Sequence, residues 1–389
     1  MSHEPGVHPG DVPVAGLLRT DDLQHLVDAL ISAGYDVIGP TIDQCAVIYD
    51  QITSVSQLPR GWSDSQEPGR YRLHHGDHSK YFGFAVGPHS WKKYLFPPQS
   101  IVSTATRCEN GWQLSTDVPA PPRLAFLGVR ACELAAIEIQ DRVFLHGPWI
   151  DPIYKARREA AFIIAVNCTS AASTCFCSST NTGPKCRAGF DLALTEIASG
   201  FVIETGSESG RAIAAALPLE PVAEQHRAEA AAATAQAEAM MTRELKTDDL
   251  HDLLLGNLKH PHWEDVAKRC LSCTNCTMVC PTCFCSTVTE VSDLTGDHVE
   301  RERKWDSCFN IDFSYMNGTP VRNSIASRYR QWLTHKLASW QDQFGTLGCV
   351  GCGRCITWCP PGIDLTEEVA KLRDSVQQDS LHATAENPS

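Results

Sequence analysis

The sequence predicts an N-terminal α+β region that continues into an α/β region with a mostly parallel sheet, followed by a mainly helical domain. Three observations favour this fold class. Between residues 121 and 222, short apolar runs alternate with amphipathic stretches, as strands alternate with helices in parallel sheets. Residues 323–343 repeat apolar side chains with the helical period. A chain of 389 residues is also long enough for two or three domains.

The first 120 residues are expected to form the α+β region. Residues 19–35 have the helical period, and Gly34 is predicted to end that helix. Strand-like runs follow at 36–39, 46–52 and 81–86. The stretch 60–80 is rich in Gly, Ser, Asp and His, so it is predicted to be a loop.

The α/β region is predicted over residues 121–222, after a proline-rich break at 119–122. Its expected strands are 123–129, 161–166 and 201–204, and its expected helix is 131–145. Residues 223–259, dominated by Ala, Glu, Gln and Leu, are predicted to be a helical connector, with a flexible alanine-rich linker as the alternative. The domain at 260–374 follows, and the polar tail at 375–389 is predicted to be disordered.

Charge and hydropathy limit the partners and the location. Lys and Arg number 33 against 46 Asp and Glu, giving a net charge of −13, which argues against nucleic acid or an anionic membrane surface as the main partner. The first 16 residues lack the basic and apolar segments of a secretory signal, and no apolar run is long enough to span a bilayer. We therefore expect a cytoplasmic protein with no membrane contact, in which 18 cysteines favour metal or redox chemistry over disulfides.

Two cysteine motifs in the C-terminal domain have the spacing C-x2-C-x2-C-x3-C-P, which is typical of bacterial ferredoxins with two [4Fe–4S] clusters. Three thiolates on one tight loop can reach three irons, and the fourth cysteine ligates the other cluster. One cluster is thus expected on Cys270, Cys273, Cys276 and Cys359, and the other on Cys349, Cys352, Cys355 and Cys280. Zinc is the alternative, but its sites usually need only two separated pairs of ligands. The long separation of the motifs resembles helical dicluster ferredoxin domains.

A third cysteine group follows two predicted strands. Cys132 comes after the strand ending near residue 130, and Cys168 comes after the strand ending near residue 167. Parallel α/β sheets place ligands at such carboxyl ends. Together with Cys175 and Cys177, these thiols are predicted to hold a third [4Fe–4S] cluster, with Cys186 as the rival fourth ligand. The alternative is a set of buried or redox-active thiols.

The remaining cysteines are less specific. Cys283, Cys285 and Cys308 flank the first motif and are expected to form either another site or a shell of thiols. Cys45 and Cys108 are predicted to be buried packing residues.

With these motifs in place, the chain resembles the beta, iron–sulfur subunit of cytoplasmic NAD(P)-linked [NiFe] hydrogenases (sulfhydrogenases), a family related to one of the subunits of anaerobic sulfite reductase. The resemblance covers most of the chain and includes YDVIGP at 35–40, LPRGW at 58–62, PGRYR at 68–72, GVRACEL at 128–134, TCFC at 174–177 and CPTCFC at 280–285. Ala131 stands where the family usually has Pro. Cys186 matches no family position, which favours Cys132 as the fourth ligand.

The resemblance implies an electron-transfer subunit in a hetero-oligomer. It would relay electrons between a flavin- and NAD(P)-binding subunit and the small and large hydrogenase subunits, or serve a sulfite reductase or another NAD(P)-linked oxidoreductase in the same way. The residues agree with a non-catalytic role, because the chain contains no G-x-G-x-x-G between strand and helix, no P-loop lysine and no C-x-x-C-H haem motif. A cluster-based sensor is a further alternative, but no basic DNA-binding helix is present.

Overall fold

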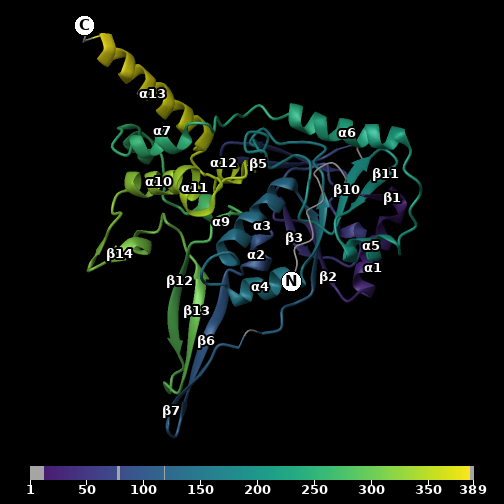
Figure 1. Ribbon diagram of the computed structural model, residues 1–389, viewed down its shortest axis with the longest axis horizontal. Coiled ribbons are helices and arrows are strands. Elements are labelled where there is room, and N and C mark those ends of the chain that lie inside the picture. The colour runs from purple at the N-terminus through teal and green to yellow at the C-terminus, as the bar shows by residue number, and fades with distance from the viewer. Residues whose placement is uncertain (1–12, 77–78, 118, 386–389) are drawn as a thin grey trace.

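A seven-stranded mixed sheet forms the centre of the N-terminal region in the computed structural model, which describes residues 13–76, 79–117 and 119–385 (Figure 1). The strand order is β1-β11-β10-β9-β8-β2-β3. The strands are β1 (Val14–Arg19), β2 (Asp36–Asp43), β3 (Ala46–Gln51), β8 (Leu124–Val129), β9 (Phe162–Val166), β10 (Leu192–Ile197) and β11 (Gly200–Thr205).

The sheet is parallel only in its middle. The pairs β2–β8, β8–β9 and β9–β10 are parallel, whereas β2–β3, β10–β11 and β1–β11 are antiparallel. The expectation of a mostly parallel sheet is therefore only partly right. Tight hairpins cause the difference: β2 turns into β3 through Gln44 and Cys45, which both have positive φ, and two residues connect β10 to β11.

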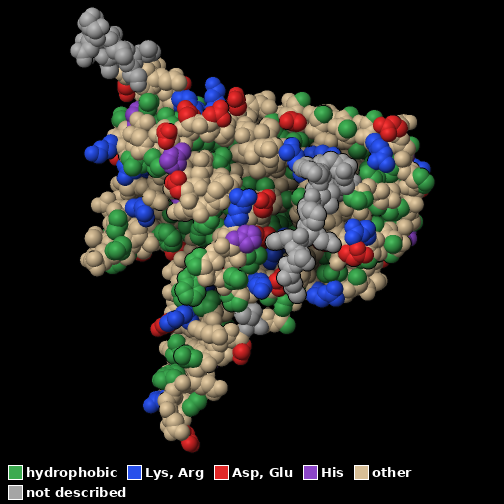
Figure 2. Space-filling model, viewed as in Figure 1, with side chains coloured by type: hydrophobic (Ala, Val, Ile, Leu, Met, Phe, Trp, Pro, Cys, Tyr) green, Lys and Arg blue, Asp and Glu red, His purple; other side chains and the backbone are tan. Residues whose placement is uncertain are grey.

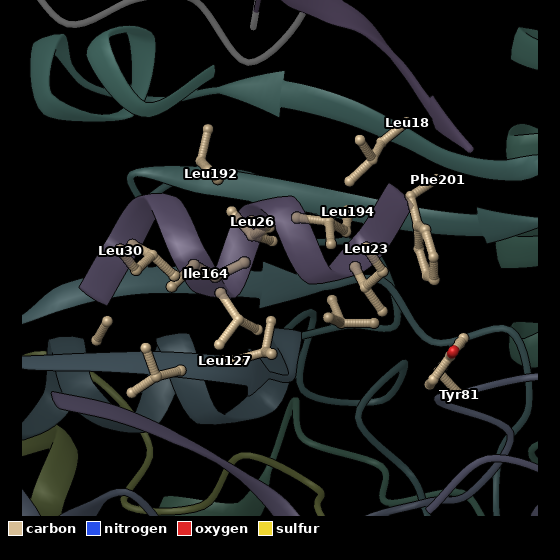
Figure 3. Close-up of a cluster of buried hydrophobic side chains, with 14 of the residues drawn as sticks. Leu18, Leu23, Leu26, Leu30, Tyr81, Leu127, Ile164, Leu192, Leu194 and Phe201 are labelled. Carbon is tan, nitrogen blue, oxygen red and sulfur yellow. The ribbon is translucent and has the colours of Figure 1, made fainter. Parts of the chain in front are cut away.

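Helices cover both faces of this sheet. On one face, α1 (Leu23–Ser32) packs Leu26 and Leu30 against the strands, as Figure 3 shows, and α5 (Glu208–Ala214) joins the same core. On the other face lie α3 (Ala131–Phe144), α4 (Pro152–Ala160) and the short α2 (Lys92–Leu95). On this same face, α6 (Glu224–Ala239) contacts β10 and β11 (Figure 1).

Two expectations for the N-terminal region were wrong. The stretch 60–80, predicted to be a loop, contains the hairpin β4 (Trp62–Glu67) and β5 (Arg70–His75). The predicted strand at 81–86 is irregular, because side chains take the place of a neighbouring strand. The carboxylate of Glu196 accepts hydrogen bonds from the N–H groups of Tyr81 and Phe82, at 2.7 and 3.0 Å. The guanidinium of Arg130 donates hydrogen bonds to the carbonyls of Phe82 and Phe84, at 3.0 and 2.9 Å.

A four-stranded antiparallel arm projects from the body (Figure 1). Its order is β12 (Ser286–Ser292), β13 (His298–Trp305), β6 (Gln99–Cys108) and β7 (Gly111–Ser115). Because β13 pairs with β6, the arm joins strands from both halves of the chain. Apolar side chains gather along it in Figure 2, and the exposed ones include Ile101, Trp112, Leu114, Val288 and Val291.

The C-terminal region combines short helices with the β12–β13 hairpin, so it is only partly the mainly helical domain that was expected. Its helices are α7 (Leu250–Gly256), α8 (His262–Ala267), α9 (Asn275–Met278), α10 (Ile325–Thr334), the π-helical η4 (His335–Ser339), α11 (Trp340–Phe344), α12 (Arg354–Thr357) and α13 (Leu365–Ala385). The smaller elements of this region are η3 (Ile311–Ser314), β14 (Tyr315–Met316) and β15 (Thr319–Pro320). The N-terminal region also contains the short helices η1 (Thr20–Asp22) and η2 (Val55–Gln57).

The connector and the tail differ from their predictions. The helix of the connector stops at Ala239, and residues 241–247 have no regular structure before α7 begins. The tail that was predicted to be disordered from residue 375 is helical as far as Ala385, and residues 386–389 lie outside the described part. Among the described residues, no helix has both the length and the apolar character needed to cross a bilayer.

Candidate metal centres

The first cysteine group brings together residues from both motifs. Five cysteines line one cavity at the C-terminal helices: Cys270, Cys273, Cys276 and Cys359, together with Cys355 of the second motif. Burial raises the pKa of Cys276 well above the usual thiol value, and the neighbouring thiols of Cys359, Cys270 and Cys273 raise it further. The last cysteine of the second motif therefore lies with the first three of the first motif.

Two unpaired donors line the same cavity. The Tyr329 hydroxyl and the Trp332 indole N–H are buried, and neither has a hydrogen-bond partner among the described residues. Buried polar groups are normally hydrogen-bonded, so an acceptor in this cavity would satisfy them. Cys273 is exposed, and Leu271 beside it is 64% exposed, so this group lies nearest to solvent.

The second group mirrors the first. Another cavity is lined by Cys280, Cys349, Cys352 and Cys355, together with Lys336. Burial raises the pKa of Cys355 well above its usual value, and the thiols of Cys349, Cys280 and Cys352 add to the effect. The fourth cysteine of the first motif thus lies with the first three of the second motif.

The two motif loops share one backbone shape. Ser272 and Thr274 have φ of 50° and 68°, and their counterparts Gly351 and Gly353 have φ of 61° and 74°. These left-handed residues turn backbone N–H groups toward sulfur: Ser272 N–H donates to the Cys270 sulfur at 3.4 Å, and Gly351 N–H donates to the Cys349 sulfur. Such N–H groups offset negative charge on bound thiolates.

The second loop needs glycine because another segment crosses it closely. A Cβ on Gly351 would lie 2.6 Å from the backbone of Cys177, and a Cβ on Gly353 would lie 2.4 Å from the Thr174 carbonyl oxygen. The Phe176 N–H also donates to the Gly351 carbonyl at 2.8 Å. The TCFC segment at 174–177 therefore packs directly on the second motif.

The third group begins at the ends of two neighbouring parallel strands. Cys132 is the second residue of α3, directly after β8, and Cys168 follows β9, which pairs with β8 in parallel. Burial raises the pKa of Cys132 well above its usual value, and the thiols of Cys352 and Cys177 raise it further. The thiol of Cys168 similarly adds to the effect of burial on the pKa of Cys175, which reaches about 12.

Cys186 is also close to this group, but in a different position. Cys186 is buried, and its N–H donates to the Asn167 side chain at 2.7 Å. Burial raises the pKa of Cys186, and the thiol of Cys168 raises it further. Cys132 instead faces Cys177 and Cys352. Cys132 thus lies on the side of the third group that meets the second group.

Buried cations accompany the thiols, and the sequence analysis missed most of them. Lys336, 2% exposed, donates to the Cys280 sulfur at 3.3 Å. Burial raises the pKa of Cys168, and the positive charge of Arg130 opposes that rise. The helical periodicity around Lys336 placed it on a helix, but no local pattern marks a lysine that faces a cysteine 56 residues away.

A buried ion pair was also missed. Arg354, within the second motif, forms an ion pair with Glu133 on α3 at 2.7 Å, and both side chains are at most 1% exposed. Glu133 also accepts hydrogen bonds from Tyr49 at 2.8 Å and from Trp91 at 3.0 Å. The sequence offered one sign of this ion pair, because Glu133 directly follows Cys132 and Arg354 directly precedes Cys355.

The other cysteines divide into two kinds. Cys45 and Cys108 are exposed, contrary to prediction, because each lies at the tip of a hairpin, β2–β3 and β6–β7 respectively. Cys283, Cys285 and Cys308 gather where the arm joins the helices, and the thiol of Cys308 lowers the pKa of Cys285.

The donor chemistry fits a cluster. Among the residues that the structure describes, no three His, Cys, Asp or Glu side chains converge closely enough to hold a single metal ion. A single zinc ion binds all of its thiolates, at Zn–S distances of about 2.3 Å, whereas each thiolate around a [4Fe–4S] cluster binds a different iron. The fit rests on groups of neighbouring thiols, N–H groups directed at sulfur, buried cations and unpaired donors.

Comparison with known proteins agrees with this geometry. A family model described as a 4Fe-4S dicluster domain matches residues 269–363, which indicates [4Fe–4S] clusters. The chain is 29% identical over 290 residues to sulfhydrogenase 2 subunit beta of Pyrococcus furiosus, and the alignment covers 73% of this chain and 83% of that protein. No solved structure matches the chain significantly.

Proposed function

We propose that this chain, an electron-transfer iron–sulfur subunit of the hydrogenase beta type, relays single electrons between a flavin- and NAD(P)-binding subunit and the small and large subunits of a [NiFe] hydrogenase. The observation that carries the proposal is the closeness of the second cysteine group to both of the others. The second group shares neighbours with both others: Cys280 lies near Cys276 of the first group, and Cys352 lies near Cys132 of the third.

The ligands are proposed group by group. Cys270, Cys273, Cys276 and Cys359 would hold one [4Fe–4S] cluster, and Cys280, Cys349, Cys352 and Cys355 would hold a second. Cys132, Cys168, Cys175 and Cys177 would hold a third. A bound cluster of this kind supplies a centre that gains or loses one electron at a time.

The residues of the chain prepare these sites for negative charge. Lys336 beside Cys280 and Arg354 beside Cys352 place buried positive charge around the second group. Arg130 serves Cys168 in the third group in the same way. Buried charges are stable only when they are paired. Arg354 is already paired with Glu133, whereas no carboxylate among the described residues forms an ion pair with Lys336 or Arg130, so these two cations favour thiolates over neutral thiols.

Burial suggests where the relay meets its partners. The first group is exposed at Cys273, whereas Cys132 and Cys177 of the third group are 7% and 5% exposed. We expect the first group to face another chain of the complex at the surface. The relative from Pyrococcus furiosus is named as a subunit, which supports an assembly of several chains.

The ligands of the third group can be tested by iron analysis. Cys132→Ala should lose about four irons per chain, one cluster, because a cluster without one thiolate is labile. Cys186→Ala is the matched control, since it removes a buried thiol beside the same group, and it should keep all its iron. Loss of iron in Cys186→Ala alone would assign the fourth ligand to Cys186 instead.

The relay is tested by reduction under strict anaerobiosis. NAD(P)H should not bleach the visible cluster absorbance of the isolated chain, because the sequence contains no dinucleotide fingerprint. Adding the flavin subunit should allow bleaching by NAD(P)H, and adding the hydrogenase subunits should allow bleaching by hydrogen. Rapid bleaching of the isolated chain by NAD(P)H, with flavin bound to it, would refute a pure relay.

A further inference from the structure

Two cysteines outside the proposed ligand groups lie at the base of the β12–β13 hairpin. Cys285 directly precedes β12, and Cys308 follows β13 by three residues. The last rung of the hairpin pairs Ser286 with Trp305, and the Asp306 N–H donates to the Cys285 carbonyl at 2.9 Å. The register of the hairpin therefore places Cys285 opposite Asp306, two residues before Cys308.

The two side chains interact electrostatically. The thiol of Cys308 is the largest influence on the pKa of Cys285, which it lowers, and the backbone N–H of Cys308 acts in the same direction. Close approach of two sulfurs is the arrangement that disulfide formation requires, since the S–S bond is only about 2.05 Å long.

The surroundings favour a reactive thiolate at Cys285. The Cys308 thiol, assisted by the ammoniums of Lys336 and Lys92, lowers the pKa of Cys285 to about 7. Lys92 is 4% exposed, donates to the Cys283 carbonyl at 3.1 Å and lies 4.0 Å from the centre of the Trp305 ring. No carboxylate among the described residues forms an ion pair with Lys92 or Lys336.

We propose that Cys285 and Cys308 form a redox-active thiol pair, which low-molecular-weight disulfides oxidise to an intramolecular disulfide and thiols reduce again. Both residues are partly exposed, so a small disulfide can approach them. A thiol whose pKa lies near the ambient pH is the most effective attacking group in such exchange. This site goes beyond the proposed relay and does not depend on it.

The exchange balances without another reactant. The Cys285 thiolate attacks one sulfur of the small disulfide, whose S–S bond breaks and whose second half leaves as a thiolate that takes up a proton. Cys308 then loses its proton and attacks the Cys285 sulfur of the mixed disulfide, which releases the second small thiol. Two protein thiols are oxidised and one small disulfide is reduced to two thiols.

The pair is coupled to the first cysteine motif through a short path. Ser307, next to Cys308, accepts a hydrogen bond from the Thr277 hydroxyl at 2.8 Å. Thr277 directly follows Cys276. Closing the disulfide would therefore fix the arm against the loop that carries the first proposed cluster.

The test uses the full chain, prepared anaerobically with its iron, and oxidised glutathione as the probe. After treatment, alkylation and digestion, mass spectrometry should find a peptide pair joined through Cys285 and Cys308, and dithiothreitol should remove it. Cys308→Ser should lose the joined pair and accumulate glutathione on Cys285. Cys45→Ser, which removes an exposed thiol far from the hairpin base in sequence and sheet, should retain the joined pair.

Free thiols at both positions after wild-type chain is treated with glutathione disulfide would overturn the proposal. Loss of iron in Cys308→Ser would also overturn it, because Cys308 would then be a metal ligand. The wild-type measurement needs no variant to fold. Failure of the relay would appear separately, as wild-type protein that binds no iron while the thiol pair still closes.

Discussion

Replacing Glu133 by Gln tests whether a buried ion pair fastens the sheet region to the second cysteine motif. Glu133 lies in the first turn of α3, immediately after Cys132, and its partner Arg354 lies between Cys352 and Cys355. The Glu133 carboxylate and the Arg354 guanidinium are 2.7 Å apart, and neither side chain is more than 1% exposed. The pair therefore bridges the second and third cysteine groups.

The expected loss follows from the contacts. Removing one partner of a buried ion pair typically costs about 3–5 kcal/mol, because the other charge remains buried without compensation. The Arg354 guanidinium keeps its hydrogen bonds to the carbonyls of Gly87 and His89, at 2.9 and 2.8 Å, but these are neutral acceptors. We expect Glu133→Gln to lower the free energy of unfolding by about 3–5 kcal/mol.

Urea unfolding of the full chain, followed anaerobically, measures this loss. Glu138→Gln on the same helix is the matched control, because Glu138 forms an exposed pair with Arg142 at 2.8 Å. Exposed pairs of this spacing contribute only about 0.3–0.5 kcal/mol. The double variant Glu133→Gln/Arg354→Met should be less destabilised than the sum of its single changes. Equal losses in Glu133→Gln and Glu138→Gln would refute the reasoning.

Two further predictions concern the C-terminal region. Burial opposes ionisation of Glu368, but His262, whose ring lies 3.3 Å from the carboxylate, and a hydrogen bond from Arg269 at 2.8 Å lower its pKa to about 2. The ionised Glu368 should contribute its full stability above the unfolded pKa of about 4.3, and this contribution should be lost as the pH falls toward 2. The urea midpoint of Glu368→Gln should therefore depend less on pH over that range than the midpoint of the wild-type chain. Gly353→Ala should cost more than the roughly 1–2 kcal/mol of a left-handed residue, because its Cβ would lie 2.4 Å from the Thr174 carbonyl oxygen. An unchanged urea midpoint in Gly353→Ala would contradict the close packing.

Apolar periodicity within short stretches of the sequence predicted several strands and one helix. The apolar runs of β2, β3, β8 and β9 and the helix α3 were placed within a few residues of their observed bounds. The order of strand and helix then located Cys132 and Cys168 at neighbouring strand ends. The spacing of the two four-cysteine motifs similarly predicted which thiols become neighbours in the first two groups.

Features that depend on distant pairing could not be predicted in this way. The β6 strand pairs with β13, which comes from the other half of the chain, so neither strand carries a local sign of the arm. Residues 81–86 have an apolar, strand-like pattern, but Glu196 and Arg130 bind their backbone groups instead of a neighbouring strand. Cysteine is a residue type that is usually buried, but Cys45 is exposed because it lies in a tight turn.

The metal content of anaerobically prepared full-length chain tests the central proposal most directly. Iron and acid-labile sulfide should each reach about twelve per chain, four for each of three cysteine groups, with Mössbauer spectra of [4Fe–4S] type. About eight of each would confine the clusters to the two C-terminal groups and remove the third group from the relay. Zinc as the dominant metal, in protein never exposed to air, would contradict the proposal as a whole.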